Sequence, residues 1–169
     1  MGNPSIQVHP DQLRIRPVDP VHVGELIRIA DETNLSPWSA QGYLDEMKNE
    51  DAIMLRLVSE HNRTVGFIVG RTITGGEIET RLDAEIYNIA IAGKYQGNGF
   101  GQILFDAYVQ ICRDRGVQNI WLDVRESNQK AICFYERNGF TRVQTRNYFY
   151  NNPREHALLM RLELGQKDI

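Results

Sequence analysis

Several features that define specialised protein classes are missing or scarce in this sequence. Its 169 residues include only two cysteines, and no Cys or His spacing is typical of a metal site. No apolar run approaches the roughly 20 residues that cross a bilayer. Cys112 and Cys133 fall on apolar positions of expected helices, which predicts buried free thiols rather than a disulfide, a metal ligand or a nucleophile. We therefore expect neither a disulfide-stapled, nor a metal-dependent, nor a membrane-spanning protein.

A large net charge is missing too. Lys and Arg number 19 against 22 Asp and Glu, a net of -3, which argues against a nucleic-acid binder that depends on phosphate neutralisation. The polar start Met1-Gly2-Asn3-Pro4 lacks the basic and apolar regions of a secretory signal, so we expect a cytoplasmic protein. With 41% hydrophobic and 24% charged residues, the composition is that of one globular domain.

Hydrophobic periodicity predicts an α/β fold in which helices cover a mixed sheet. The expected strands span residues 13–18, 53–59, 64–72, 84–92, 119–125, 140–150 and 156–163. The expected helices span residues 21–32, 100–112 and 128–138, with a further helix starting at Ser36. Residues 1–12 have no periodicity, which predicts a flexible arm before a single domain at 13–169.

The loop between the expected strand 84–92 and the clearest helix is rich in glycine, with the sequence Gln96-Gly97-Asn98-Gly99-Phe100-Gly101. Glycines let a backbone approach a ligand closely, and the first-turn N–H groups of a helix favour a pyrophosphate. A structural turn without a ligand is the alternative. A dinucleotide-binding loop needs a small residue at Gln102 or Leu104, and an NTPase loop needs Gly-Lys-Ser/Thr, so neither fits. The pattern that remains is Gln-x-x-Gly-x-Gly.

This loop, preceded by Ile89-Ala90-Ile91, resembles the acetyl-CoA signature of the GCN5-related N-acetyltransferase (GNAT) superfamily. Other segments resemble the RimI type, whose members acetylate the N-terminal alanine of a ribosomal small-subunit protein. These segments are Trp121-Leu122-Asp123-Val124-Arg125-Glu126-Ser127-Asn128, Ala131-Ile132-Cys133-Phe134-Tyr135-Glu136-Arg137-Asn138-Gly139-Phe140, Arg146-Asn147-Tyr148-Phe149 and Ser36-Pro37-Trp38-Ser39. The resemblance covers roughly residues 13–163. It implies the GNAT fold, a mostly antiparallel twisted sheet of about seven strands flanked by about four helices.

The resemblance also implies an activity, the transfer of an acetyl group from acetyl-CoA to a protein N-terminal amine by direct attack in a ternary complex. It implies acetyl-CoA as cosubstrate and no metal. The expected partner is a protein N-terminus, possibly that of a ribosomal protein, with no nucleic acid or membrane, and the expected state is a monomer or weak dimer. Two alternatives stay open. One is an acetyltransferase for a small amine or a lysine, and the other is a non-catalytic acyl-CoA-binding module.

By the same resemblance, the cofactor site combines strand backbone, glycine loop and one helix cap. Its expected residues are Ile89, Ala90, Ile91, Gln96, Gly97, Asn98, Gly99, Phe100, Gly101, Gln102 and Asn128. Asn128 would both cap its helix, a role that Ser127 could also fill, and bind the pantetheine arm. Gly97 and Gln102 stand where RimI-type sequences often carry Arg. We therefore expect backbone N–H groups to bind the phosphates, with a somewhat weaker and salt-sensitive affinity for CoA.

Acetyl transfer to an amine needs a base for the amine and an acid for the leaving thiolate. The resemblance places the base at Asp123 and the acid at Tyr135. RimI-type enzymes have Glu where this chain has Asp123, which is shorter by roughly 1.5 Å, so a bridging water is an alternative to direct abstraction. Glu85, at the start of the strand before the glycine loop, is a rival base. Asp123 paired with Arg125 and Tyr135 as a core aromatic are the structural alternatives.

On the acceptor side, Trp38, Tyr148 and Tyr150 could frame a slot for a peptide N-terminus, although Trp38 could instead pack under the second helix. Charge is split along the chain, with 14 acidic and 8 basic residues in 1–85 but 8 acidic and 11 basic residues in 86–169. The positive half contains the glycine loop, and an acidic half suits a cationic N-terminus. An uneven distribution without functional meaning is the alternative.

Overall fold

The computed structural model describes residues 12–36, 38–74 and 81–165, and the expected arm at 1–12 lies outside this range except for Gln12. The described residues contain seven strands, four α-helices and two 3-10 turns at Pro20–His22 and Gly93–Tyr95. The strands are β1 (Arg14–Pro17), β2 (Ala52–Val58), β3 (Thr64–Thr74), β4 (Leu82–Ile91), β5 (Asn119–Arg125), β6 (Thr141–Asn151) and β7 (Arg154–Glu163). The helices are α1 (Val23–Glu32), α2 (Ala40–Met47), α3 (Phe100–Asp114) and α4 (Gln129–Arg137).

The strands form one sheet in the order β1-β2-β3-β4-β5-β7-β6. The pairs β1–β2, β2–β3, β5–β7 and β6–β7 are antiparallel, whereas β4 and β5 are parallel. The predicted mixed and mostly antiparallel sheet is therefore confirmed. The chain divides into two compact units, a first within residues 1–71 and 88–111 and a second within residues 72–87 and 112–169.

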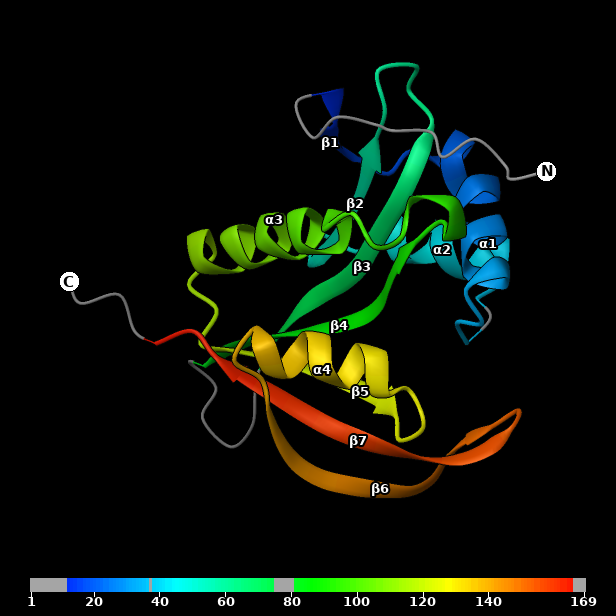
Figure 1. Cartoon of the computed structure of the whole chain (residues 1–169). Helices are drawn as coiled ribbons and strands as arrows, with labels where there is room; N and C mark the ends of the chain where they lie inside the picture. The colour runs from blue at the N-terminus through cyan, green and yellow to red at the C-terminus, as the bar shows by residue number, and fades with distance from the viewer. Residues whose placement is uncertain (1–11, 37, 75–80, 166–169) are drawn as a thin grey trace. The chain divides into compact units, whose positions relative to one another are not determined.

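In the first unit, α2 contacts both α1 and β2, and Figure 1 shows α1 and α2 next to each other. α1 buries Val23, Leu26, Ile29 and Ala30 along one face, as the helical spacing of apolar residues predicted. α2 starts later than expected. The Ser39 hydroxyl accepts a hydrogen bond from the Gly42 N–H at 3.0 Å, so the helix begins at Ala40 instead of near Ser36.

In the second unit, the Asn128 side chain accepts a hydrogen bond from the Ala131 N–H at 3.1 Å and begins α4. Asn128 is therefore the cap, and Ser127 is not. Cys112 is buried as predicted, but the prediction for Cys133 is wrong because its side chain is exposed. α4 buries Ile132, and the next residue points about 100° away around the helix, so Cys133 lies on the solvent side.

Asp83 on β4 is a buried carboxylate that links β4 to β5 in the second unit. It accepts hydrogen bonds from Asn119 Nδ2 at 2.9 Å and from the Trp121 indole N–H at 2.8 Å. Arg81 Nε donates a third bond at 3.0 Å. Burial by itself raises the pKa of Asp83, but these three donors outweigh burial and hold the pKa below its ordinary value. The native state therefore favours the ionised form of this carboxyl.

Asp83→Ala is expected to lower the free energy of unfolding by about 3 kcal/mol, because it leaves the Asn119 and Trp121 donors buried without an acceptor. In the wild type the stabilisation is present at neutral pH and is lost as the pH falls through the acidic range, since a lowered pKa means that the unfolded chain binds the proton first. Urea unfolding at pH 7 and pH 3 measures both effects. Asp45→Ala, at an exposed carboxylate that pairs with Lys48, is the control and should shift the unfolding midpoint much less than Asp83→Ala. Equal unfolding midpoints for Asp83→Ala and wild type would contradict the assignment.

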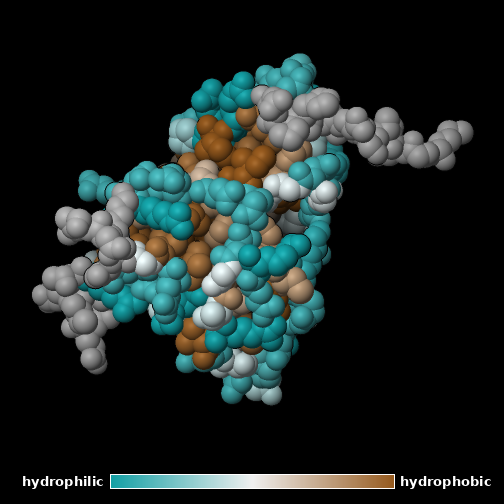
Figure 2. All heavy atoms as spheres, turned by 60° about the vertical axis from the view of Figure 1, so that its left-hand side comes forward, coloured by the Kyte–Doolittle hydropathy of each residue, from teal (hydrophilic) through white to brown (hydrophobic). Residues whose placement is uncertain are grey.

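No helix in the described part of the chain is long and apolar enough to cross a membrane. Within the same residues, no group of three or more His, Cys, Asp or Glu side chains could hold a metal ion. Hydrophilic residues cover most of the face drawn in Figure 2, with smaller hydrophobic areas between them. The large hydrophobic side chains that are exposed among the described residues are Val21, Val143, Tyr148 and Phe149. Three of these four lie on β6, which is an edge strand of the sheet.

Candidate active site

The glycine loop lies in the first unit, between the end of β4 and the start of α3. Gly97 and Gly99 have φ angles of +79° and +76°, in the left-handed region that disfavours residues with a Cβ. A Cβ added at either position would meet no atom within 4 Å. The backbone conformation, and not crowding, is therefore the reason for glycine at both positions.

Hydrogen bonds from its own side chains hold the loop. Gln96 Nε2 donates to the Ile91 carbonyl at 3.0 Å, and Asn98 Nδ2 donates to the carbonyls of Tyr95 and Gln96, each at 3.1 Å. Tyr95 itself is buried and anchors the loop to the first unit. The Gln102 side chain donates to Asp106 of α3 at 2.8 Å. This contact keeps the Gln102 amide on its own helix.

The start of α3 offers backbone donors. Among the described residues, none accepts a hydrogen bond from the N–H groups of Phe100 and Gly101, whereas the Gln102 N–H donates to the Gly99 carbonyl at 3.1 Å. Helix N-termini carry a partial positive charge that favours phosphate groups. Gly97, Asn98 and Gly99 are exposed and border this end of the helix. The loop therefore fits the pyrophosphate of a CoA-type ligand through its backbone.

Two contacts that the sequence analysis missed position this loop within the first unit. Glu32 of α1 accepts a hydrogen bond from the Gly93 N–H at 3.0 Å, at the point where the loop begins. Gly66 of β3 lies so close to β4 that an added Cβ would be 2.6 Å from the Ala90 carbonyl oxygen. Ala90 is buried, and the predicted cofactor residues Ile89 and Ile91 are half-buried. Glycine at position 66 was the only sign of this close approach in the sequence.

Gly99→Ala is expected to weaken CoA binding about tenfold, because an L-residue at this left-handed φ costs about 1–2 kcal/mol and the loop would relax away from its native shape. Isothermal titration calorimetry with CoA measures the change. Gly93→Ala is a matched control, since its Cβ would also meet nothing within 4 Å and its φ lies outside the left-handed region. Equal dissociation constants for the two variants would contradict a role for the backbone conformation.

Trp38, the predicted acceptor residue of the first unit, packs against α2. Its ring centroid lies 5.3 Å from that of Tyr43, a fully buried residue whose ring also contacts Phe67 of β3 at 6.2 Å. The structure therefore favours the alternative interpretation, in which Trp38 covers the second helix. A role in acceptor binding stays a prediction.

Asp123 lies on β5 in the second unit, with a side chain that is 11% exposed. Its Oδ2 is 3.2 Å from Arg146 Nη1 of β6, while its Oδ1 is buried and has no hydrogen-bond partner among the described residues. Burial raises the pKa of Asp123, and the charge of Arg146 opposes this rise without cancelling it. The structural alternative, in which Asp123 pairs with Arg125, is wrong, because Arg125 pairs with Glu155 at 3.3 Å. A buried carboxylate oxygen without a donor and a raised pKa are properties of a general base.

Tyr150, a predicted acceptor residue, lies next to Asp123. Its hydroxyl donates to the Asp123 carbonyl oxygen at 3.2 Å, and the Arg125 guanidinium lies 4.1 Å from its ring centroid. Burial, with a smaller contribution from the Asp123 charge, raises the pKa of Tyr150 to about 12. Glu155 joins this cluster to the start of α4 by accepting a hydrogen bond from the Ser127 N–H at 2.6 Å. The cluster holds Tyr150 and the backbone of Asp123 in place.

Tyr135, the predicted acid, projects from α4 in the second unit and is 7% exposed. Its ring contacts those of Phe134 at 5.5 Å and Phe140 at 5.4 Å. Burial raises the pKa of Tyr135 well above its ordinary value, and the nearby Tyr150 adds to the rise. The phenol is therefore protonated at physiological pH and can donate a proton. The second unit thus brings Asp123, Tyr150 and Tyr135 together.

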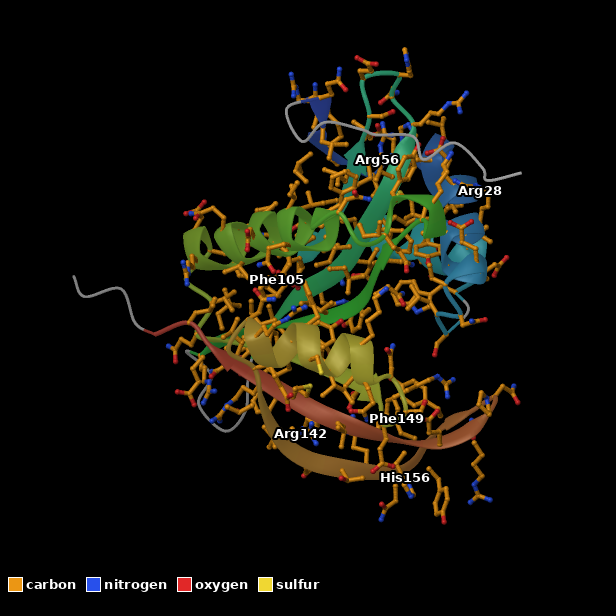
Figure 3. All side chains as sticks on the ribbon, viewed as in Figure 1. Arg28, Arg56, Phe105, Arg142, Phe149 and His156 are labelled. Carbon is orange, nitrogen blue, oxygen red and sulfur yellow. The ribbon has the colours of Figure 1, made fainter. Side chains whose placement is uncertain are left out.

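The other predicted residues of the second unit are Glu85, Tyr148 and Asn128. Glu85 of β4 is directly opposite Trp121 of β5, two residues before Asp123, so the three side chains share one face of the sheet. Tyr148 is 56% exposed, and its ring lies 4.6 Å from that of His156. Figure 3 shows His156 and Phe149 on the ribbon formed by β6 and β7. Asn128 is exposed at the start of α4, where its side-chain oxygen Oδ1 accepts the capping hydrogen bond from the Ala131 N–H.

Comparison with known proteins identifies the family of this chain. The profile of the Acetyltransferase (GNAT) family matches residues 23–140. A [Ribosomal protein bS18]-alanine N-acetyltransferase from Haemophilus influenzae is 37% identical over 138 residues, which is 80% of this chain and 88% of that protein. The crystal structure of Ard1 from Thermoplasma volcanium has a TM-score of 0.81 at 25% identity and covers 92% of this chain and 99% of its own.

The ribosomal-protein-S18-alanine N-acetyltransferase from Escherichia coli has a similar fold, with a TM-score of 0.78 at 24% identity and coverage of 93% of this chain and 98% of that one. The family profile spans most of the chain, including the glycine loop, Asp123 and Tyr135. The fold predicted from the sequence is the fold of these proteins. The chain therefore belongs to the acetyltransferase (GNAT) family and is an acetyl-CoA-dependent N-acetyltransferase.

Proposed function

We propose that this enzyme transfers the acetyl group of acetyl-CoA to the N-terminal α-amine of a protein, with the N-terminal alanine of ribosomal protein bS18 as the leading acceptor. The observation that carries this proposal is the 37% identity to the bS18-alanine N-acetyltransferase of H. influenzae, extending over 88% of that protein. A second relative with the same name, from Haemophilus ducreyi, is 30% identical over 92% of its length. The solved neighbours share the fold that this proposal requires.

The second unit supplies the acid and base of the reaction. The amine attacks the thioester carbonyl, so that the new C–N bond forms as the C–S bond breaks. The proton of the amine goes to Asp123 Oδ1, directly or through a water, and the leaving thiolate takes the proton of Tyr135. An α-amine has an ordinary pKa of about 7.7–8.0, which is far lower than that of a lysine at about 10.4. A carboxylate with a moderately raised pKa is therefore a sufficient base for an N-terminus.

The first unit supplies the cofactor loop. The backbone donors at the start of α3 bind the pyrophosphate of acetyl-CoA, and the β4 backbone at Ile89 and Ile91 binds the pantetheine arm. For Asn128, which belongs to the second unit, binding of the pantetheine arm stays a prediction from the sequence. Neither Gly97 nor Gln102 adds a positive charge at the loop, so the partial charges of the backbone N–H groups and of the helix end bind the phosphates. Because salt screens this attraction, the affinity for CoA should fall as salt rises.

The test uses pairs of peptides with the N-terminal sequence of bS18, identical except that one of each pair has a blocked α-amine, together with acetyl-CoA. Mass spectrometry after incubation should find one acetyl group on the free peptide and none on the blocked one. A bS18 peptide in which the first residue is changed from alanine to a bulky residue should react more slowly. Acetylation of the blocked peptide would indicate a lysine acceptor instead. Absence of reaction with any peptide or protein amine would leave a small amine or a binding module as the function.

A further inference from the structure

Arg146 of β6 lies in a segment that resembles the RimI type and beyond the residues matched by the family profile, and neither comparison assigns it a role. Its guanidinium contacts a single oxygen of Asp123, at 3.2 Å, and leaves Oδ1 buried and without a partner among the described residues. The contact is therefore one-sided, unlike the bidentate Arg–carboxylate pairs that serve as structural links. A one-sided contact stabilises the negative charge and keeps the second oxygen available for a proton.

The sheet explains how Arg146 reaches Asp123 although β7 separates their strands. In the register of the three strands, Arg146 of β6 lies opposite Ala157 of β7, which lies opposite Arg125 of β5. The three residues thus form one row on one face of the sheet, and Asp123 shares this face because it is two residues from Arg125. Ala157 is the small member of the row. Its methyl group leaves room for the Arg146 side chain to cross the middle strand.

From these contacts we propose that Arg146 is a positioning residue for acetyl transfer, holding Asp123 ionised and fixed while the buried Oδ1 accepts the proton of the acceptor amine. This inference rests on the proposed function of Asp123 as base. The Arg146 side chain is 39% exposed. One part of it therefore faces solvent and salt, while its guanidinium contacts the Asp123 carboxylate. Its guanidinium also lies 5.4 Å from the ring centroid of Phe149, which restricts its orientation.

The other polar groups around Asp123 act less directly on its carboxylate. The Tyr150 hydroxyl donates its hydrogen bond to the Asp123 backbone carbonyl and not to the carboxylate. Arg125 and Glu155 form an ion pair with each other. Glu85 of β4 shares the face of the sheet, and Tyr135 of α4 is close to Tyr150. Arg146 is therefore the cation with the direct contact to Asp123 among the described residues. Removing it should raise the pKa of the base, because burial would then act unopposed.

The experiment compares Arg146→Gln, Arg146→Lys and Arg142→Gln with wild type, using the pH dependence of kcat/KM for the free-amine bS18 peptide between pH 5 and 9. Arg142 is the matched control, since it also lies on β6, loses the same charge and pairs with Glu136 at 2.8 Å. Figure 3 shows Arg142 and Phe149 at different places along this strand. Arg146→Gln should move the part of the acidic limb that Asp123 contributes up by about one pH unit, with a loss of kcat/KM that approaches tenfold at pH values below the wild-type limb. Arg146→Lys should restore most of the wild-type profile, and Arg142→Gln should leave it unchanged.

A carbon-13 NMR titration of the Asp123 carboxyl in wild type and Arg146→Gln measures the same effect without turnover. An upward shift of its pKa in the variant supports the inference. An acidic limb and a carboxyl pKa that do not move, or that move equally in Arg142→Gln, would overturn it. If no variant and no wild-type protein acetylates the peptide, the proposed acceptor is wrong. The NMR titration then decides whether Arg146 controls the ionisation of Asp123.

Discussion

Asp123→Asn should lower kcat/KM for acetylation of a free N-terminal peptide by about 100-fold or more at neutral pH, within the range that a general base contributes. The amide keeps the size of the side chain but cannot accept the proton of the attacking amine. Burial raises the pKa of Asp123. As the pH is lowered, wild-type kcat/KM should therefore fall at a pH above about 3.9, the ordinary pKa of Asp. The substitution should remove the part of the acidic limb that Asp123 contributes and leave the part that comes from protonation of the acceptor amine, whose ordinary pKa is about 7.7–8.0. Steady-state kinetics across pH measures both effects.

Glu85→Gln is the matched comparison for Asp123→Asn. Both substitutions neutralise one carboxylate on the same face of the sheet, and Glu85 lies opposite Trp121 near the start of the β4–β5 pairing. We expect Glu85→Gln to change kcat/KM by less than about fivefold, because Asp123 is the carboxylate with the buried oxygen that lacks a partner among the described residues. A large loss in Glu85→Gln together with a small loss in Asp123→Asn would reverse the assignment of the base.

Tyr135→Phe should lower kcat by about 100-fold or more while the dissociation constant for CoA stays within about threefold of wild type. The substitution removes the proton that the leaving thiolate needs and keeps the ring contacts with Phe134 and Phe140. The raised pKa of this phenol ensures that the wild type carries the proton throughout the physiological pH range. Single-turnover kinetics and calorimetry with CoA separate the chemical step from binding.

Two results would contradict the role of Tyr135. Unchanged kcat in Tyr135→Phe would show that another group or water protonates the thiolate. A parallel loss of CoA affinity and of folding stability would show that Tyr135 is mainly a core aromatic. Tyr108→Phe is a suitable control, since Tyr108 is a fully buried tyrosine of α3 outside the proposed acid and base group. This control should retain most of the wild-type turnover.

The elements that carry the site were largely predictable from the sequence. Apolar spacing placed α3, β5 and α4 within a few residues of their observed bounds, and the glycine loop was located between β4 and α3. Local patterns contain this information, because helical and strand periodicities and caps depend on neighbours along the chain. The start of α2 was misplaced because Ser36 and Ser39 are both good caps, and only the hydrogen bond to Gly42 distinguishes them.

The residues that surround Asp123 were not predictable in the same way. Arg125 is two residues away in the sequence and was the partner in the alternative interpretation of Asp123, yet it pairs with Glu155 and lies over the Tyr150 ring. Arg146 is 23 positions further along the chain and became the partner instead. The exposure of Cys133 also depended on which face of its helix packs against the rest of the unit. Each of these outcomes depends on contacts between segments that are distant in the sequence.

The sequence alone predicted the class of fold and the position of the glycine loop, because these follow from local periodicity and glycine patterns. Its resemblance to RimI-type sequences offered Asp123 as a candidate base and Tyr135 as a candidate acid. The tertiary structure alone decided which charge faces Asp123. The order β5-β7-β6 places Ala157 between Arg146 and Arg125, and its small side chain lets a cation from the edge strand reach a buried carboxylate. Strand order and register depend on the packing of the whole sheet, and no local pattern specifies them.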